Sequence, residues 1–92
     1  MKTYTGERTA RGVVVTVDGQ PLRDPSDPHD PIGFEWGYDG PEPLNLSRAL
    51  LEDCVGRSVD QSQIADFLAH IVRGLDNWWT LSEDDVRSVA RQ

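Results

Sequence analysis

The sequence predicts an α+β fold: a small antiparallel sheet of three strands, or four, packed against two longer helices and one short C-terminal helix. Two observations predict it. A run of β-branched residues followed by a turn signal lies near the start of the chain, which is typical of a hairpin. The second half carries apolar residues at helical spacing between helix start and stop signals. At 92 residues, the chain is expected to form one compact domain, residues 1-92, with an acidic, proline-rich loop at 23-33.

The first predicted strands form a hairpin. Residues 12–17, GVVVTV, are rich in β-branched side chains, which favour a pleated backbone over a helix. Residues 3–7, TYTGE, are short and extended enough to pair with residues 13–17 in antiparallel fashion. Asp18-Gly19 is a strong turn signal after the second of these strands.

Two further segments are candidates for strands. A third strand is predicted at residues 33–38, because Phe34, Trp36 and Tyr38 alternate with Gly or Glu. This period of two places the three aromatic side chains on one face, where helices would cover them. Residues 77–81 are predicted to be either a linker or a short fourth strand.

Three helices follow from apolar periodicity and end signals. The first is predicted at 43–55, with Pro43 in its first turn and Gly56 as its stop. The second is predicted at 60–74, where six apolar residues recur at helical spacing. The third is predicted at 83–90, because Ser82 and Asp85 have the spacing of a capping box.

The charge is uneven along the chain. There are 16 acidic and 9 basic residues, and the net charge is -7. Between residues 18 and 42, seven carboxylates stand against Arg23 alone. An acidic surface repels phosphates, so direct nucleic-acid binding is not expected. Such a surface can attract a basic, nucleic-acid-binding protein, although the alternative is that the charge serves only solubility.

Composition also excludes several classes of protein. Cys54 is the only cysteine, so an internal disulfide and a cysteine-rich zinc site are excluded. No apolar run approaches the roughly 20 residues of a membrane span, so no membrane partner is expected. The N-terminal MKTYTGERTARG has no hydrophobic signal region, and we expect a cytoplasmic protein.

The acidic loop is the nearest approach to a metal or catalytic site. Asp24, Asp27, His29 and Asp30 include the ligand types of a metal centre, but their spacing matches no calcium loop. A solvated loop is the favoured interpretation, without metal or cofactor. His29 could form an acid–base pair with Asp24, Asp27 or Asp30, but no nucleophile motif accompanies it. Cys54 lies on an apolar helix face, so we expect it to be a small core residue and no nucleophile. Since no phosphate loop, dinucleotide fingerprint or HExxH motif is present either, we expect a protein that is not an enzyme.

The tryptophans are more informative about binding. Trp78 and Trp79 cannot both point into one core if the backbone is extended, because successive side chains alternate. One of them should face outward, where tryptophan is a favoured interface anchor. The alternative is that both lie flat over a thin core.

Residues 29–51, HDPIGFEWGYDGPEPLNLSRALL, carry a resemblance to a known family. This stretch resembles the family catalogued as domain of unknown function 6166, whose members typically read HSPxGFEWGYGGSGPAQLALALL. Similar matches are Tyr4-x-Gly6-x-Arg8, Val15-x-Val17-Asp18-Gly19-x-Pro21-Leu22 and Trp79-x-Leu81-Ser82. Small residues of the family turn are replaced by Asp30, Asp39, Pro41 and Glu42, an apolar residue by Arg48 and a proline by Asp76. The family has no established activity and occurs in bacteria, phages and mobile elements, so the resemblance implies a small accessory protein and supplies no catalytic residues.

Together these observations favour a non-enzymatic acidic interaction protein, encoded by a phage or mobile element, that binds a basic host protein or nucleoprotein complex. Its concrete form is an inhibitor of a CRISPR–Cas effector that acts by charge mimicry. This hypothesis assumes that the carboxylates gather in one patch. The predicted partner-binding residues are Asp24, Asp27, Asp30, Glu35, Trp36, Asp39, Glu42 and Trp78.

The alternatives are a small ligand- or metal-binding accessory module at the proline-rich loop, and an enzyme that uses His29. The sequence leaves open whether the protein is a monomer or a homodimer.

Overall fold

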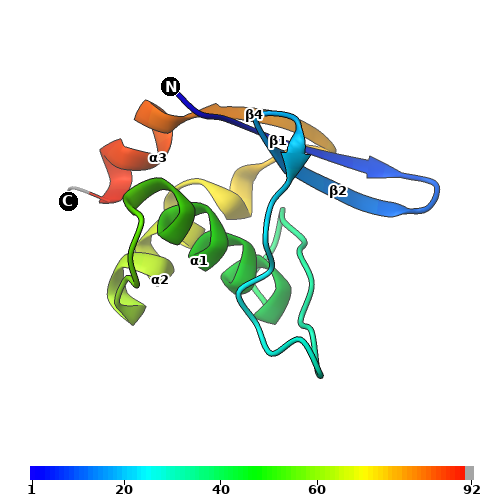
Figure 1. Ribbon diagram of the computed structural model, residues 1–92, viewed down its shortest axis with the longest axis horizontal. Helices are drawn as coiled ribbons and strands as arrows, with labels where there is room; N and C mark the ends of the chain where they lie inside the picture. Colours follow the sequence, from blue (N-terminus) through cyan, green and yellow to red (C-terminus); the bar gives the residue numbers. More distant parts are fainter. Residues whose placement is uncertain (91–92) are drawn as a thin grey trace.

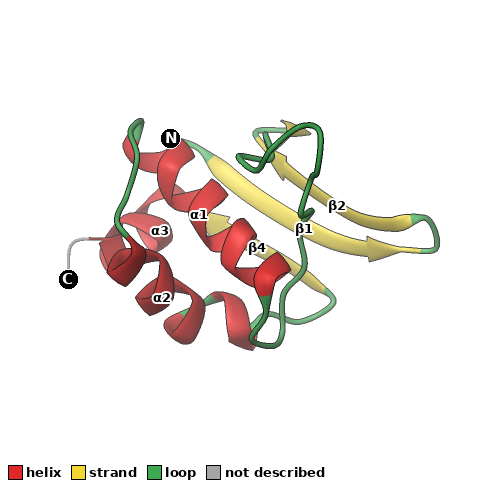
Figure 2. Ribbon diagram, turned by 90° about the horizontal axis from the view of Figure 1, so that it is seen from below, coloured by secondary structure: helices red, strands yellow, loops and turns green. Residues whose placement is uncertain are grey.

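The computed structural model describes residues 1–90, with Ala90 described by its backbone alone. A four-stranded antiparallel sheet lies on one side of the molecule and the helices lie on the other (Figures 1 and 2). The strands are β1 (Thr3–Thr9), β2 (Gly12–Val17), β3 (Gln20–Pro21) and β4 (Trp78–Ser82), and their order in the sheet is β3-β2-β1-β4. The helices are α1 (Pro41–Val55), α2 (Gln61–His70), the short 3-10 helix η1 (Val72–Gly74) and α3 (Glu83–Ala90).

The predicted hairpin is confirmed, and of the two alternatives for residues 77–81, a linker or a fourth strand, the structure has the strand β4. β1 and β2 are antiparallel, with Gly6 opposite Val15. On its other edge β1 pairs with β4, and Gly6 lies opposite Trp79. The first and last strands of the chain are therefore neighbours, which places β1 in the interior of the sheet and β4 at its edge. The α+β class is as predicted.

The predicted third strand at residues 33–38 is wrong. Gly33 and Gly37 have φ values of 81° and 87°, which a regular strand does not allow. The segment is held by single contacts instead: the Gly37 N–H donates to the Val72 carbonyl at 3.0 Å. Trp36 is fully buried while Tyr38 is 43% exposed, so the aromatic residues do not share one face. The alternation in the sequence reflects these glycine turns and no sheet register.

The first helix begins slightly earlier than predicted. α1 starts at Pro41, where a proline N–H is not needed, and Pro43 still lies in its first turn. Its end at Gly56 is as predicted: this glycine has a φ of 75°, and its N–H donates to the Glu52 carbonyl at 2.8 Å.

The second helix is shorter than the predicted range 60–74, and the third is as predicted. Asp60 caps α2 in a capping box with Gln63, but the helix stops at His70. Ile71 departs from helical geometry, and η1 completes the predicted range. At α3, the Ser82 hydroxyl accepts from the Asp85 N–H at 3.0 Å, and the Asp85 carboxylate accepts from the Ser82 N–H at 2.9 Å.

Two tryptophans occupy the centre of the core. The rings of Trp36 and Trp79 meet edge to face, with centroids 5.6 Å apart. The ring of Trp79 lies directly over Gly6 of β1, where any side chain would overlap it. Around this pair pack side chains from every layer, including Tyr4, Val15, Leu46, Leu50, Leu51, Phe67, Val72 and Val86.

The contact between Gly6 and Trp79 predicts a large effect for a single methyl group. We expect Gly6→Ala to lower the free energy of unfolding by about 1–3 kcal/mol, because the added carbon overlaps the buried Trp79 ring. Gly74→Ala is the control, since no atom lies within 4 Å of a methyl group there. Urea unfolding measures both. Equal stability of the two variants would contradict this packing.

Candidate functional site

The segment from Phe34 to Tyr38 is fixed to the sheet by Arg8. The Arg8 guanidinium donates to the Trp36 carbonyl at 2.6 Å and to the Asn77 side chain at 2.7 Å. It also forms an ion pair with Glu35 at 3.0 Å and lies 4.8 Å from the centre of the Trp36 ring. Trp36 Nε1 donates to the Asp76 carbonyl at 2.6 Å. This part of the chain is therefore a structural joint between β1 and the segment that leads into β4.

The burial of Trp36 corrects one predicted site residue. Trp36 was expected to supply contact area to a partner, but none of its surface is exposed. Its indole N–H and ring are already engaged by Asp76, Arg8 and Trp79. A partner could reach Trp36 only if the core opened.

The assumption of one free acidic patch is wrong in part, because arginines of the chain pair with two of its members. Glu35 pairs with Arg8, and Asp39 pairs with Arg73 at 3.4 Å. The second pair is exposed on both sides, so it contributes little to stability, but it still lowers the local charge. Asp18 lies apart from the others, at the turn after β2, where it accepts from the Thr3 N–H at 2.9 Å.

Asp24 is occupied by the loop itself. Its carboxylate accepts from the Ser26 N–H at 2.8 Å, from the Gly33 N–H at 3.0 Å and from the Asn45 amide at 2.8 Å. Burial alone would raise the pKa of Asp24, but the hydrogen bonds from Asn45, Ser26 and Gly33 together outweigh it and lower the pKa. Asp24 therefore organises the loop and ties it to α1.

The remaining predicted carboxylates are more available. Asp27 and Asp30 are exposed on the loop, and one oxygen of Asp27 accepts from the His29 N–H at 2.9 Å. Glu42 is half-buried and lies 3.4 Å from the Tyr38 hydroxyl. Of the predicted acidic set, Asp27 and Asp30 are the ones best placed to meet a partner.

Trp78 is placed as the alternation argument requires. Trp79 is buried, and Trp78 is 62% exposed on the opposite face of β4. We define the outer sheet face by the side chains of Thr5, Glu7, Val14, Thr16, Trp78 and Thr80. In the register of the sheet, Glu7 lies between Val14 and Trp78. The helices lie on the other side of the sheet, so within residues 1–90 no helix covers this face (Figure 1).

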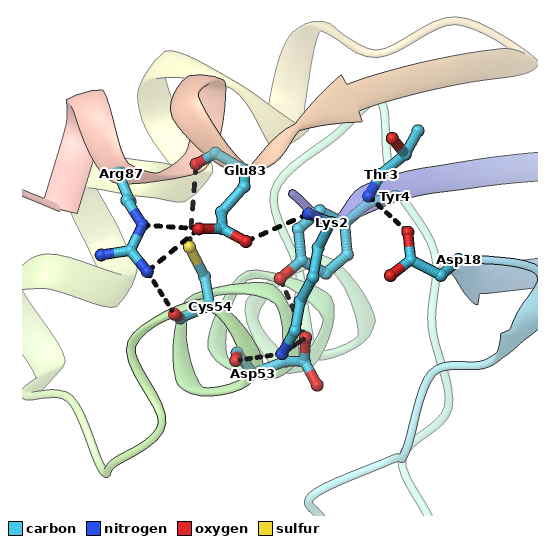
Figure 3. Close-up of polar contacts among 8 residues, drawn as sticks. All are labelled: Lys2, Thr3, Tyr4, Asp18, Asp53, Cys54, Glu83 and Arg87. Carbon is cyan, nitrogen blue, oxygen red and sulfur yellow. Dashed lines mark hydrogen bonds and ion pairs between the residues drawn. The ribbon is translucent and has the colours of Figure 1, made fainter.

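A polar network near Cys54 was not found from the sequence (Figure 3). The Tyr4 hydroxyl donates to Asp53 at 2.8 Å, and Lys2 Nζ lies 3.2 Å from the same oxygen. Glu83 accepts from the Lys2 N–H at 3.1 Å and pairs with Arg87 at 3.1 Å. The network joins β1, α1 and α3. No sequence motif indicates this network, because its members are distant in the sequence.

The pKa directions in this network indicate a structural role. Burial, reinforced by the Asp53 carboxylate, raises the pKa of Tyr4. Burial also raises the pKa of Cys54, so its thiol stays protonated and is a weak nucleophile. The hydrogen bond from the Lys2 N–H, assisted by Arg87, lowers the pKa of Glu83. Cys54 is thus a small core residue, as predicted.

A pocket lies beside this network. It has a volume of about 380 Å³ and is lined by Leu22, Arg23, Pro25, Ala49, Glu52, Asp53, Gly56 and Arg57. Residues 22–25 and 49–57 form it together, which is why the sequence alone gave no sign of it. Within residues 1–90, Arg23 and Arg57 form no ion pair, whereas Glu52 pairs with Arg48.

The described part of the chain contains neither a cluster of metal-binding side chains nor a helix that could span a membrane. Residues 1–90 contain no group of three or more histidine, cysteine or acidic side chains placed to hold a metal ion. Over the same residues, none of the helices has the length and apolar character needed to cross a bilayer.

Residues 4–92 match the family described as "Family of unknown function (DUF6166)". The chain belongs to the DUF6166 family. This confirms the resemblance seen in residues 29–51. No curated protein and no solved structure matches the chain. In this DUF6166 protein the FEWGY block is a structural joint in which Trp36 is fully buried, while Tyr38 keeps 43% of its surface exposed.

The hydrogen bonds of Asp24 predict a pH-dependent contribution to stability. A carboxylate with a lowered folded-state pKa stabilises the fold above its ordinary value of 3.8, and this contribution is lost as the pH falls through the folded-state pKa. We expect Asp24→Asn to cost about 1–3 kcal/mol at about pH 7, with the difference from wild type shrinking below about pH 4. Urea unfolding at the two pH values measures this.

Asp30→Asn is the matched control. Its side chain is exposed on the same loop and forms no hydrogen bond among the described residues. A difference between wild type and Asp24→Asn that stays constant with pH would exclude the charge of Asp24 as the cause.

Proposed function

We propose that this protein is a non-enzymatic interaction protein that binds a basic surface of another protein. The observation that carries this proposal is Trp78: a large aromatic side chain is 62% exposed on the sheet face that no helix of residues 1–90 covers. Exposed tryptophans are favoured anchors of protein interfaces. Val14, 48% exposed, adds apolar area to the same face.

The charges near Trp78 favour a basic partner. Glu7 is its cross-strand neighbour, and Asp76 precedes it by two residues. Both carboxylates are exposed, and neither forms an ion pair within residues 1–90. With a net charge of -7, the whole chain adds a negative field that steers a basic surface toward it.

The specific version is inhibition of a host nucleic-acid-binding complex, such as a CRISPR–Cas effector, by charge mimicry. The exposed carboxylates of Asp27 and Asp30 support it, together with Glu7 and Asp76. Glu35 and Asp39 support it less, since Arg8 and Arg73 pair with them. The structure therefore favours Trp78 and its neighbours over the proline-rich loop as the centre of contact.

Affinity capture from host lysate tests this function. We expect a nucleic-acid-binding protein, identified by mass spectrometry, to be retained by wild type. Its affinity should fall about tenfold or more with Trp78→Thr, which removes the anchor while keeping a strand-forming residue. Leu44→Gln is the control, because Leu44 is an exposed apolar residue on α1, in the helical layer.

The salt dependence of binding tests the electrostatic part of this proposal. Retention should weaken between low and high salt, and the double variant Glu7→Gln, Asp76→Asn should reduce that dependence. Equal retention of all variants at every salt concentration would exclude both the anchor and the charge contribution.

A second candidate function is supported by the pocket beside Asp53. Its volume of about 380 Å³ falls in the range of small-molecule sites, and cationic and anionic side chains line it together. Lys2 and the Tyr4 hydroxyl hold one oxygen of Asp53 in place. A small ligand that carries both an anionic and a cationic group matches this lining.

Thermal-shift screening with free amino acids and small organic anions tests the pocket. A ligand at 100 times its Kd stabilises by about 2.7 kcal/mol, which raises the melting temperature by several degrees. We expect Arg57→Gln to abolish the rise. Arg11→Gln, on the β1–β2 turn, should not affect it. A rise that survives in Arg57→Gln would place the ligand elsewhere.

A further inference from the structure

The outer edge of β4 carries backbone groups that the sheet does not use. The Arg8 N–H donates to the Asn77 carbonyl, and the Glu83 N–H donates to the Lys2 carbonyl. These two bonds fix the phase of the antiparallel ladder, in which alternate residues bond to the neighbouring strand. Residues 77, 79, 81 and 83 therefore face β1, and residues 78, 80 and 82 direct their N–H and C=O groups away from it.

Of these three residues, Trp78 and Thr80 keep their outward backbone groups available. The N–H of the third, Ser82, already donates to the Asp85 carboxylate at 2.9 Å. Trp78 and Thr80 are both exposed, and within residues 1–90 their backbone groups bond to no other segment. In the same part of the chain, β1 and the following helix α3 are the elements that pack extensively against β4. The edge at Trp78 and Thr80 is therefore open.

The two edges of the sheet differ in protection. Proteins blunt exposed edges with very short strands, prolines or charged side chains, because an open edge pairs with other chains. β3 follows this rule: it has two residues and ends at Pro21. β4 does not: it has five residues, WWTLS, with no proline and no charge. The unprotected edge is also the one beside the exposed Trp78.

We propose that β4 binds an extended, basic segment of the partner protein, which adds to the sheet as a fifth strand. The proposal rests on the proposed interaction function and specifies its mode. Backbone bonds to Trp78 and Thr80 would give affinity, and the Trp78 side chain would pack against a β-branched or aromatic residue of the segment.

Charge complementarity identifies the occupant. Acidic residues stand at both ends of β4: Asp76 precedes it, and Asp84 and Asp85 lie in the first turn of α3. Glu7 lies next to Trp78 on β1. All four are exposed, and because Asp76 precedes β4 while Asp84 and Asp85 follow it, a segment along the outer edge of β4 would have carboxylates at both of its ends, where lysine or arginine would pair with them.

A second copy of this chain fits the edge less well. Antiparallel pairing of two β4 strands about Thr80 would bring Asp76 of one copy toward Asp84 and Asp85 of the other. Each copy also carries a net charge of -7. Like charges across paired strands are destabilising, which disfavours the homodimer.

Selection from a phage-displayed library of random linear peptides tests the proposal on the intact protein. We expect selected peptides to be rich in lysine or arginine and in β-branched residues. Their affinity should fall at least about tenfold in Thr80→Pro, which removes the outward N–H and leaves the bonds to β1 intact. Thr80→Ala keeps that N–H and should bind like wild type.

Hydrogen exchange gives an independent readout. The amide hydrogens of Trp78 and Thr80 should exchange more slowly when a selected peptide is bound. The proposal would be overturned if no peptide is enriched or if the enriched peptides are acidic. Equal binding of the selected peptides to Thr80→Pro and Thr80→Ala would also overturn it. A dimer in sedimentation that Thr80→Pro dissociates would also overturn it, because the occupant would then be a second copy.

Binding of the protein captured from lysate to these variants separates strand addition from the interaction function on which it rests. If the captured protein binds Thr80→Pro and wild type equally but is lost with Trp78→Thr, the interaction function stands and strand addition is excluded. If no basic protein is captured by wild type, the interaction function itself is excluded.

Discussion

The edge-to-face contact between Trp36 and Trp79 is the interaction on which the rest of the structure depends. It joins the segment between the loop and α1 to the last strand of the sheet, with ring centroids 5.6 Å apart. Trp79 can take this place because Gly6 on the neighbouring strand has no side chain. Arg8, from the same strand, also fixes Trp36, through a hydrogen bond to its carbonyl and a contact with its ring. The N-terminal strand is thereby held between two distant parts of the chain.

This joint assigns the two neighbouring tryptophans opposite roles. Because β4 is extended, burial of Trp79 forces Trp78 onto the outer sheet face. The packing of Trp79 in the core is therefore sufficient to expose Trp78. The same strand lies at the sheet edge, so an anchor side chain and available backbone groups occur together.

Electrostatics in this protein is decided by long-range pairing more than by composition. The chain is strongly acidic, yet Glu35 and Asp39 pair with arginines 27 and 34 residues away in sequence. Asp24 is acidic as well, but it accepts backbone and amide hydrogens that fold its own loop. Counting carboxylates therefore overestimated the unpaired charge at Glu35 and Asp39, which lie after the proline-rich loop. It also gave no weight to Glu7 and Asp76, which remain exposed beside Trp78.

The sequence by itself determined most of the local elements. The β-branched run predicted β2 and its hairpin with β1, the apolar period and the end signals predicted three helices, and the adjacent tryptophans predicted one inward and one outward ring. The two-residue strand β3 and the early end of α2 were not predicted. Backbone propensity and side-chain period act over a few residues, so they can be read directly. Tertiary structure alone decided that residues 34–38 form a glycine-turned joint, which carboxylates are neutralised and that β4 is an edge strand of the sheet. Each of these depends on contacts between residues far apart in the chain, for which local pattern carries no signal.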